Sequence, residues 1–80
     1  MRRIQKRPLS RFRKAIGEEL QKLREERQLS QKEVSARAGM RQTLVSKMEQ
    51  GEALTLDNLQ QLLQQAYCCT VGRFFAIMGE

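Results

Sequence analysis

The sequence has no histidine and no tryptophan, and it contains only one proline and two cysteines. Without histidine, the chain cannot build an imidazole-based general acid or base, or a zinc site of mixed cysteine and histidine. Cys68 and Cys69 are adjacent, which is the wrong spacing for a metal knuckle and would strain a disulfide between them. We interpret them as two small hydrophobic residues, of which Cys68 faces inward, and we expect neither a metal nor a cofactor.

Other absences concern catalysis and membranes. The sequence shows no paired carboxylates, no nucleophile with a nearby base and no glycine-rich phosphate loop, so we expect that the protein is not an enzyme. It has no run of about 18 or more apolar residues, and its basic N-terminus lacks the apolar stretch of a signal peptide. We therefore expect one small domain in a cytoplasmic protein that has no membrane partner.

Acidic residues are missing from the first fourteen positions, which hold seven of the fifteen lysines and arginines. Over the whole chain, the nine acidic residues leave a net charge of +6. Pro8 discourages helix in the residue before it, so we expect a flexible basic arm at residues 1–8 and a folded domain at residues 9–80. Such an arm commonly contacts a polyanion, and the alternative is a disordered tail that only aids solubility.

A helix is predicted between about Leu9 and Gln28. Four apolar residues recur there in one stripe with the 3.6-residue period of a helix: Phe12, Ile16, Leu20 and Leu23.

Residues 29–51 predict two short helices joined by a tight turn. Ser30 and Glu33 have the spacing of a capping box, which would begin the first helix. Gly39 can end that helix in the left-handed conformation, and Met40 would fill the corner below the turn. The second helix has three apolar residues for its inner side: Leu44, Val45 and Met48.

This stretch resembles the helix-turn-helix of the phage repressor/Cro type. The matching features are a glutamine at the start, a small residue four positions later, a glycine turn, a β-branched anchor and a glutamate before a polar–glycine pair: Gln31, Ser35, Gly39, Val45, Glu49, Gln50 and Gly51. With the flanking helices, the resemblance covers roughly residues 15–75. It implies an all-α, compact five-helix domain whose second motif helix enters the DNA major groove.

The resemblance also implies a set of DNA-contacting residues: Gln31, Arg41, Gln42, Thr43, Ser46, Lys47 and Gln50. Gln31 opens a helix, where its amide and the free N–H groups can hold a phosphate. The recognition helix would run from about Gln42 to Gln50. Gln42 can bond adenine N6 and N7 together, Thr43 offers a hydroxyl and a methyl group, and Lys47 can reach a guanine or a phosphate. Gln50 and the backbone after it resemble a second phosphate clamp.

Three further positions follow from, or depart from, the family pattern. Arg24 and Glu49 resemble the ion pair that ties the first helix to the recognition helix. Arg41 stands where serine or threonine usually caps the recognition helix, so the cap bond is lost or supplied by water, and the arginine would lie at the groove edge. Leu44 stands where the family is often polar. It would touch a thymine methyl group or add to the core, and we expect partial burial.

The C-terminal third predicts two more helices. Thr55 and Asp57 mark the start of the first, whose outer side carries four glutamines that we interpret as an uncharged surface: Gln60, Gln61, Gln64 and Gln65. Thr70 can cap the second, from Val71 to about Met78. This last helix is more apolar than one buried stripe requires, which predicts a homodimer contact through the C-terminal helices.

We therefore expect a sequence-specific transcriptional regulator that binds double-stranded DNA, and family habit favours a repressor. One alternative is the antitoxin of a toxin–antitoxin pair, which would regulate its own operon and bind a toxin through the C-terminal helices. Another is a protein–protein adaptor that keeps the fold without binding DNA. The positive charges of Arg41, Lys47 and the arm argue against an adaptor, because it has no need of cations that face a phosphate backbone.

Overall fold

Five α-helices follow one another along the chain in the computed structural model, which describes the backbone of residues 2–79 and the side chains of residues 10–79. They are α1 (Arg2–Glu26), α2 (Gln31–Ala38), α3 (Gln42–Glu49), α4 (Leu56–Tyr67) and α5 (Val71–Met78). The described residues form no strand. The expectation of an all-α, five-helix domain is confirmed.

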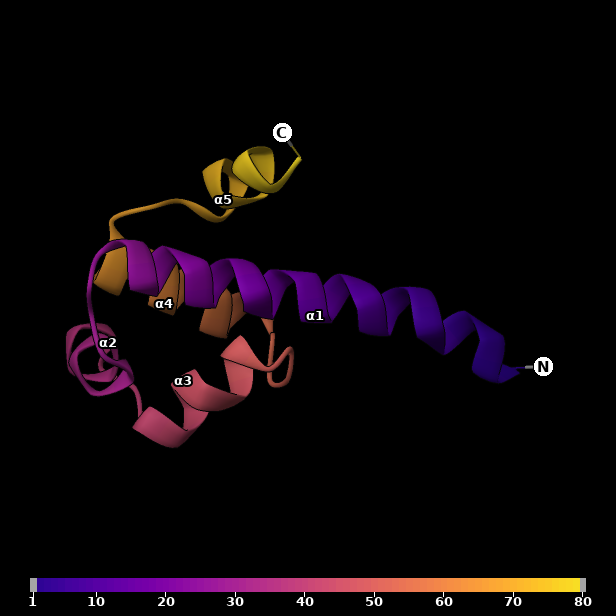
Figure 1. Cartoon of the computed structure of the whole chain (residues 1–80), viewed down its shortest axis with the longest axis horizontal. Helices are drawn as coiled ribbons and strands as arrows, with labels where there is room; N and C mark the ends of the chain where they lie inside the picture. Colours follow the sequence, from indigo (N-terminus) through magenta and orange to yellow (C-terminus); the bar gives the residue numbers. More distant parts are fainter. Residues whose placement is uncertain (1, 80) are drawn as a thin grey trace.

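The longest helix, α1, begins earlier than the sequence predicts. It starts at Arg2, whereas Pro8 led us to expect its start at about Leu9. The backbone of residues 2–8, expected as a flexible arm, is therefore described as the first turns of α1, and Met1 lies outside the described residues. The arginine, glutamine and lysine around Pro8 favour helix, and these local preferences outweigh the effect of one proline. This end of α1 projects beyond the other helices (Figure 1).

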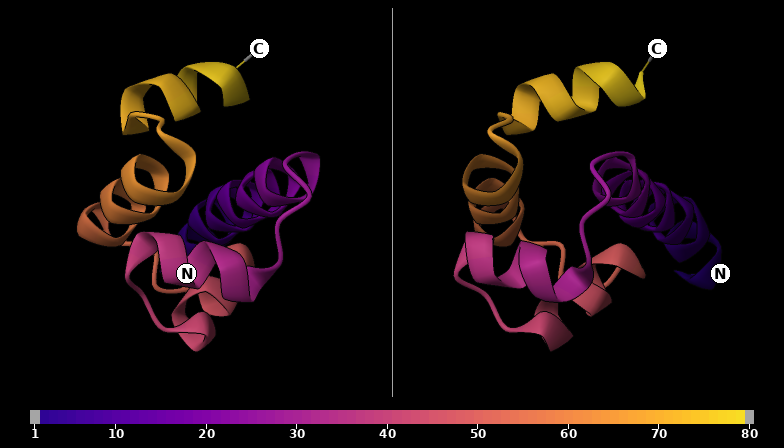
Figure 2. Two further views of the ribbon diagram at one scale, coloured as in Figure 1. Left: turned by 90° about the vertical axis from the view of Figure 1, so that its left-hand side faces the viewer. Right: turned by 60° about the vertical axis from the view of Figure 1, so that its left-hand side comes forward.

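One hydrophobic core joins all five helices. α1 lies across α3, α2 packs against both α3 and α4, and α5 lies on the far side of α1 from α2 and α3 (Figures 1 and 2). The buried core residues are Ile16, Leu20, Val34, Ala38, Val45, Met48, Leu59, Leu62, Leu63, Ala66, Tyr67 and Phe74. The predicted stripe of α1 thus reaches the core through Ile16 and Leu20. Phe12 does not, because it is 52% exposed and stacks on Phe75 of α5 with ring centroids 6.1 Å apart.

The helix starts follow the capping signals in the sequence. The Ser30 hydroxyl accepts a hydrogen bond from the Glu33 N–H at 3.0 Å, and the Glu33 carboxylate accepts one from the Ser30 N–H at 2.8 Å. The hydrogen bond from the Ser30 N–H stabilises the ionised carboxylate, and with the nearby Ser30 side chain it lowers the pKa of Glu33. Thr55 and Thr70 cap α4 and α5 through their side-chain oxygens. Gly39 has a φ of 68°, so it ends α2 in the left-handed conformation as predicted.

Gly17 sets how closely α1 approaches α3. A β-carbon at Gly17 would lie 2.5 Å from the Glu49 carbonyl oxygen and 2.7 Å from the backbone nitrogen of Gly51. Real β-carbons almost never come this close to an atom to which they are not bonded. The absence of a side chain at Gly17 therefore allows the end of α3 to rest directly on the backbone of α1.

The cysteines are arranged opposite to our expectation. Cys68 is exposed, and Cys69 is the one that packs against the core. Cys68 ends α4 in the left-handed conformation, with φ of 52°. Cys69 comes three residues after the buried Ala66 and seven after the buried Leu62, so it continues the inward side of α4, and Cys68 does not. Both thiols are free, and the described residues contain no cluster of side chains that could hold a metal ion. Among those residues, no helix combines the length and the apolar character that crossing a membrane requires.

Candidate nucleic-acid interface

Helix α3 presents a continuous polar face to solvent. Gln42, Thr43 and Lys47 are exposed, Ser46 is half-buried, and Gln50 is exposed just after the helix. These positions lie one, three or four residues apart, so they share one side of a helix with 3.6 residues per turn. The structure therefore brings five of the seven predicted contact residues onto one surface.

The opposite side of α3 is anchored in the core. Val45 and Met48 are fully buried, and Leu44 is half-buried against the same core. The expectation of partial burial for Leu44 is confirmed. Because α3 is held along its whole inner side, its polar side chains project from a fixed support.

The N-terminal end of α3 is open. Arg41 occupies the cap position without a side-chain hydrogen bond, as the sequence predicts, and its side chain is exposed. Among the described residues, the N–H groups of Gln42 and Thr43 have no hydrogen-bond acceptor. Free N–H groups and the positive end of the helix dipole make such an end suitable for a negatively charged group.

Helix α2 also begins with free donors. The capping box uses the N–H groups of Ser30 and Glu33, and the described contacts include no acceptor for the N–H groups of Gln31 and Lys32. The Gln31 side chain is half-buried at this end of the helix. The start of α2 can thus accept a negative group beside α3.

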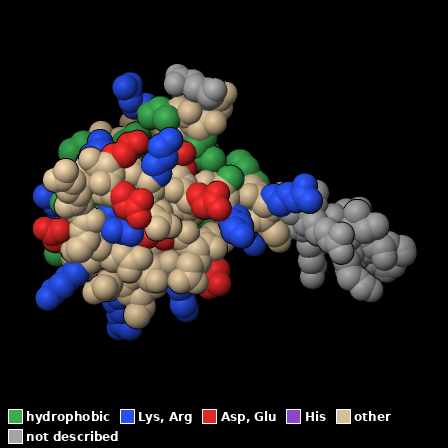
Figure 3. Space-filling view, in the orientation of Figure 1, with side chains coloured by type: hydrophobic (Ala, Val, Ile, Leu, Met, Phe, Trp, Pro, Cys, Tyr) green, Lys and Arg blue, Asp and Glu red, His purple; other side chains and the backbone are tan. Residues whose placement is uncertain are grey.

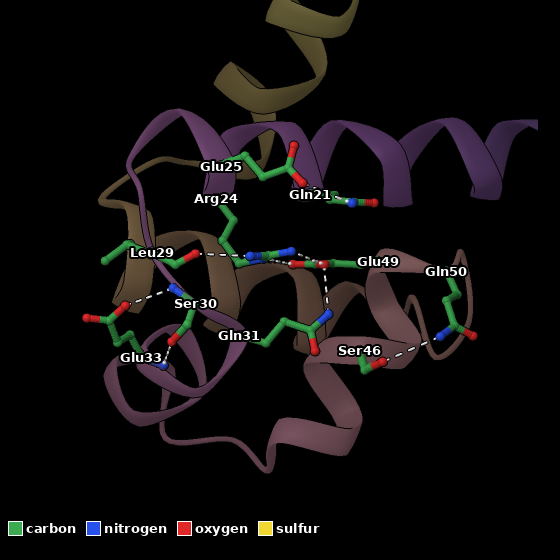
Figure 4. A network of polar contacts seen from close by, with 10 residues as sticks. All are labelled: Gln21, Arg24, Glu25, Leu29, Ser30, Gln31, Glu33, Ser46, Glu49 and Gln50. Carbon is green, nitrogen blue, oxygen red and sulfur yellow. Dashed lines mark hydrogen bonds and ion pairs between the residues drawn. The ribbon is translucent and has the colours of Figure 1, made fainter.

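A polar network ties α1, α2 and α3 together (Figure 4). The Arg24 Nε and Nη2 donate to the two oxygens of Glu49 at 2.7 and 3.1 Å, and Arg24 Nη1 donates to the Leu29 carbonyl at 3.0 Å. The predicted ion pair between Arg24 and Glu49 is confirmed. The side chains are only 14% and 5% exposed, and the hydrogen bond to Glu49 raises the pKa of Arg24. Gln31 Nε2 also donates to Glu49, at 3.0 Å.

Comparison with known protein families identifies the motif. Residues 20–65, more than half of the chain, match the family described as Helix-turn-helix. The chain belongs to the helix-turn-helix family of phage repressor/Cro-type regulators. It is therefore a DNA-binding regulator, and its family is typically non-enzymatic. No curated protein matches the chain.

In this helix-turn-helix protein, α2 and α3 are the two motif helices and Gly39 is in the turn between them. Gln50 caps the end of α3, and Gly51 follows it with φ of 88°. The N–H groups of Gln50, Gly51 and Glu52 donate to carbonyl groups of α3, so the backbone directly after Gln50 is already engaged. The predicted second phosphate clamp is therefore reduced to the Gln50 side chain, whose Nε2 donates to the Ser46 hydroxyl at 3.4 Å.

Sequence reasoning missed the role of Gln61 in supporting the helix-turn-helix. We expected an uncharged surface residue, but its Nε2 donates to the carbonyl oxygens of Ala38 and Gly39 at 2.8 and 3.4 Å. These carbonyls lie at the end of α2, where the helix offers them no N–H group. No local feature of the sequence separates Gln61 from the other three glutamines of α4. Only the fold places Gln61 beside the end of α2.

Basic side chains surround the exposed faces of the motif helices. Lys32, Arg37, Arg41 and Lys47 are all exposed. Lysine and arginine side chains project along the lower edge of the molecule in Figure 3, where Figure 1 places α3. The electrostatic environment of the open helix ends therefore favours a polyanion.

Proposed function

We propose that the protein is a sequence-specific transcriptional repressor that reads the DNA major groove with α3. The observation that carries the proposal is the outward polar face of α3, which stands on a fully anchored inner side. An α-helix fits the major groove of B-form DNA, and its exposed side chains then meet the base edges. The repressor role follows the likeness to phage repressors.

In this proposal each contact residue has a chemical role. Gln42 and Thr43, at the open end of α3, read base edges. A glutamine amide can bond adenine N6 and N7 together, and the threonine methyl group can contact a thymine methyl group. Lys47 and Arg41 contact phosphates or a guanine from the flanks of the same face. Ser46 and Gln50, which are already hydrogen-bonded to each other, act as one polar unit. Gln31 holds a phosphate from the start of α2.

Replacing Gln42 tests base reading directly. Gln42→Ala should cost about 1–3 kcal/mol on the preferred site and should relax the preference at one base pair. The melting temperature should stay the same, because the side chain is exposed and makes no described hydrogen bond. Wild type and Gln42→Ala would each be used to select sites from a random duplex pool. Equal stringency at every position would remove Gln42 from the reading set.

We further propose that the protein acts as a homodimer through α5. Ile77 is 42% exposed, Phe75 and Met78 are half-buried, and Phe12 of α1 adjoins them by stacking on Phe75. Two recognition helices must lie about 34–36 Å apart, or a multiple of this, to reach successive turns of one DNA face. A contact between two copies of α5 would fix that spacing on a two-fold symmetric operator.

Ile77 is the best position at which to test the dimer. Phe75 contacts both Phe12 and Phe74, so its replacement would also disturb the fold. Ile77→Glu should give a folded monomer that binds a half-site weakly, as measured by sedimentation and titration with duplex. An unchanged dimer in this variant would place the interface elsewhere.

The basic N-terminal segment provides a second set of proposed DNA contacts. Arg11, Arg13 and Lys14 are exposed on α1, and four more basic residues precede them: Arg2, Arg3, Lys6 and Arg7. Each phosphate contact on duplex DNA makes log affinity fall with log salt by about 0.9. Deletion of residues 2–7 should therefore make the salt dependence shallower by several units per dimer. An unchanged affinity and slope would leave the segment as a solubilising tail.

The exposed apolar residues of α5 also support a second function, that of an antitoxin whose C-terminal helices hold a toxin while α3 binds DNA. Co-purification of the native protein with a second chain seated on α5 would favour this function over that of a free-standing repressor. A protein–protein adaptor would show the same partner but no preference for any duplex at low salt.

A further inference from the structure

The contact between Gln31 and Glu49 joins two features that the sequence presented separately. Gln31 lies at the start of α2, and Glu49 is the last residue of α3. The Gln31 Nε2 donates to the same Glu49 oxygen, Oε1, that accepts from Arg24 Nη2. The expected phosphate contact and the expected ion pair are therefore parts of one network (Figure 4).

This contact leaves Gln31 with capacity for a second partner. A glutamine amide nitrogen carries two N–H groups, and Glu49 occupies one of them. The side chain is half-buried, and the described contacts give its second N–H no acceptor. The backbone N–H groups of Gln31 and Lys32 lie at the same helix end and are also free among the described contacts.

Building on the proposed DNA-binding function, we propose that Glu49 is a positioning residue for the phosphate contact made by Gln31. The Glu49 carboxylate fixes the amide of Gln31 so that its second N–H lies with the free N–H groups of α2 and donates to a phosphate oxygen. Without the carboxylate, the glutamine side chain would rotate freely, and ordering it would oppose binding.

Arg24 makes a carboxylate acceptable near a phosphate. A negative charge beside the DNA backbone would repel it, but the guanidinium forms two hydrogen bonds to Glu49 and leaves the pair with no net charge. Arg24 also donates to the Leu29 carbonyl, one residue before the cap of α2. The arginine therefore places the start of α2 and the end of α3 relative to each other.

This arrangement would couple backbone binding to base reading. Glu49 links Gln31 at the start of α2 to the end of α3. A phosphate held by Gln31 therefore fixes where α3 lies along the groove. Phosphate contacts set the register of a protein on duplex DNA, and base contacts then specify the sequence.

A double-mutant cycle on DNA affinity tests the coupling. The full chain would be compared with Gln31→Met, with the pair R24L/E49L and with all three substitutions together. Gln31→Met keeps the side-chain length and leaves both Glu49 oxygens paired with Arg24. The pair R24L/E49L removes one charge of each sign, so the net charge of +6 is unchanged. Melting curves would confirm that each variant is folded at the temperature of the titration.

We expect Gln31→Met and R24L/E49L each to weaken binding about tenfold, as for loss of one hydrogen bond to a charged group. The triple variant should bind no more weakly than either, because both changes remove the same contact. The salt dependence should not change, since a neutral amide releases no counterion. Lys47→Met is the matched control, and it should make the slope shallower by about 0.9 per subunit. Additive losses in the triple variant would overturn the positioning role.

The amide resonances of Gln31 give a second test in the unaltered protein, which remains available if R24L/E49L does not fold. On addition of the selected duplex, one side-chain N–H proton should shift and the other, facing Glu49, should keep its position. A shift of both side-chain N–H resonances would show that Gln31 leaves Glu49 on binding, which would overturn the proposal. If the wild-type chain selects no duplex at all, the proposed DNA reading is wrong, and so is the positioning role that depends on it.

Discussion

Gly17 and Gly72 provide a matched pair of substitutions that isolates the packing of α3 on α1. Both glycines lie within helices, α1 and α5. The three atoms nearest to a β-carbon at Gly17 would all be backbone atoms, the nearest of them the Glu49 carbonyl oxygen at 2.5 Å. A β-carbon at Gly72 would meet nothing within 4 Å. The same change to alanine is therefore blocked at one site and free at the other.

The expected effects have opposite signs. Alanine is favoured over glycine by up to about 1 kcal/mol within a helix, and this is the whole effect expected for Gly72→Ala. At Gly17 the same gain is opposed by overpacking, which costs about 1–3 kcal/mol or more. We place Gly17→Ala at the upper end, because a backbone carbonyl cannot rotate away as a side chain can. A net loss of about 2 kcal/mol is a large share of the total of about 4–12 kcal/mol for a chain of this length.

Urea unfolding followed by circular dichroism would measure both variants. We expect them to differ by about 3 kcal/mol, or roughly 10–20 °C in melting temperature. Gly17→Ala should also weaken DNA binding more than its stability explains, because the added methyl group pushes the end of α3 away from α1. If Gly17→Ala is as stable as Gly72→Ala, the close approach of α1 and α3 is wrong.

Three other predictions concern the ion pair, the support of α2 and the buried tyrosine. Glu49→Leu alone should lose about 3–5 kcal/mol of stability because it leaves Arg24 unpaired, whereas R24L/E49L should lose less. If the loss in R24L/E49L equals the sum of the losses in Glu49→Leu and Arg24→Leu, the pair is only a surface contact. Gln61→Leu should lose about 1 kcal/mol and Gln64→Leu almost nothing; equal losses would remove the bond to the end of α2. Tyr67, the only tyrosine, is 3% exposed, and burial raises its pKa to about 12. The stability that comes from keeping it neutral is present below its ordinary pKa of 10.0 and lost as the pH rises through about 12; absorbance showing ionisation near pH 10 in the folded protein would contradict this.

Local signals in the sequence predicted much of the fold correctly. The capping box at Ser30, the threonine caps of α4 and α5 and the left-handed Gly39 each depend on residues close together in the chain. Such signals act through short-range hydrogen bonds and backbone preferences, so the residue types alone reveal them. The polar face of α3 follows from helical period in the same way.

Long-range contacts set the limit of what sequence could predict. Gln61 is one of four similar glutamines, and only the position of α4 beside the end of α2 selects it. The link from Gln31 to Glu49 spans eighteen residues and requires α2 and α3 to be placed first. The ion pair of Arg24 with Glu49 was predicted only because the family resemblance supplied the pairing. The prediction that α1 starts at about Leu9 was wrong, because Pro8 does not interrupt the helix. The prediction that Cys68 faces inward was wrong, because Cys69 is the cysteine that packs against the core.

Selection of duplexes from a random DNA pool by the unaltered chain is the most direct test of sequence-specific reading by α3. We predict enrichment of a two-fold symmetric site whose half-sites are one helical turn apart, or a multiple of it. Gln42→Ala should relax one position in each half-site and leave the spacing unchanged. Failure of the wild-type protein to enrich any sequence at low salt, where phosphate contacts are strongest, would contradict the proposal that α3 reads DNA.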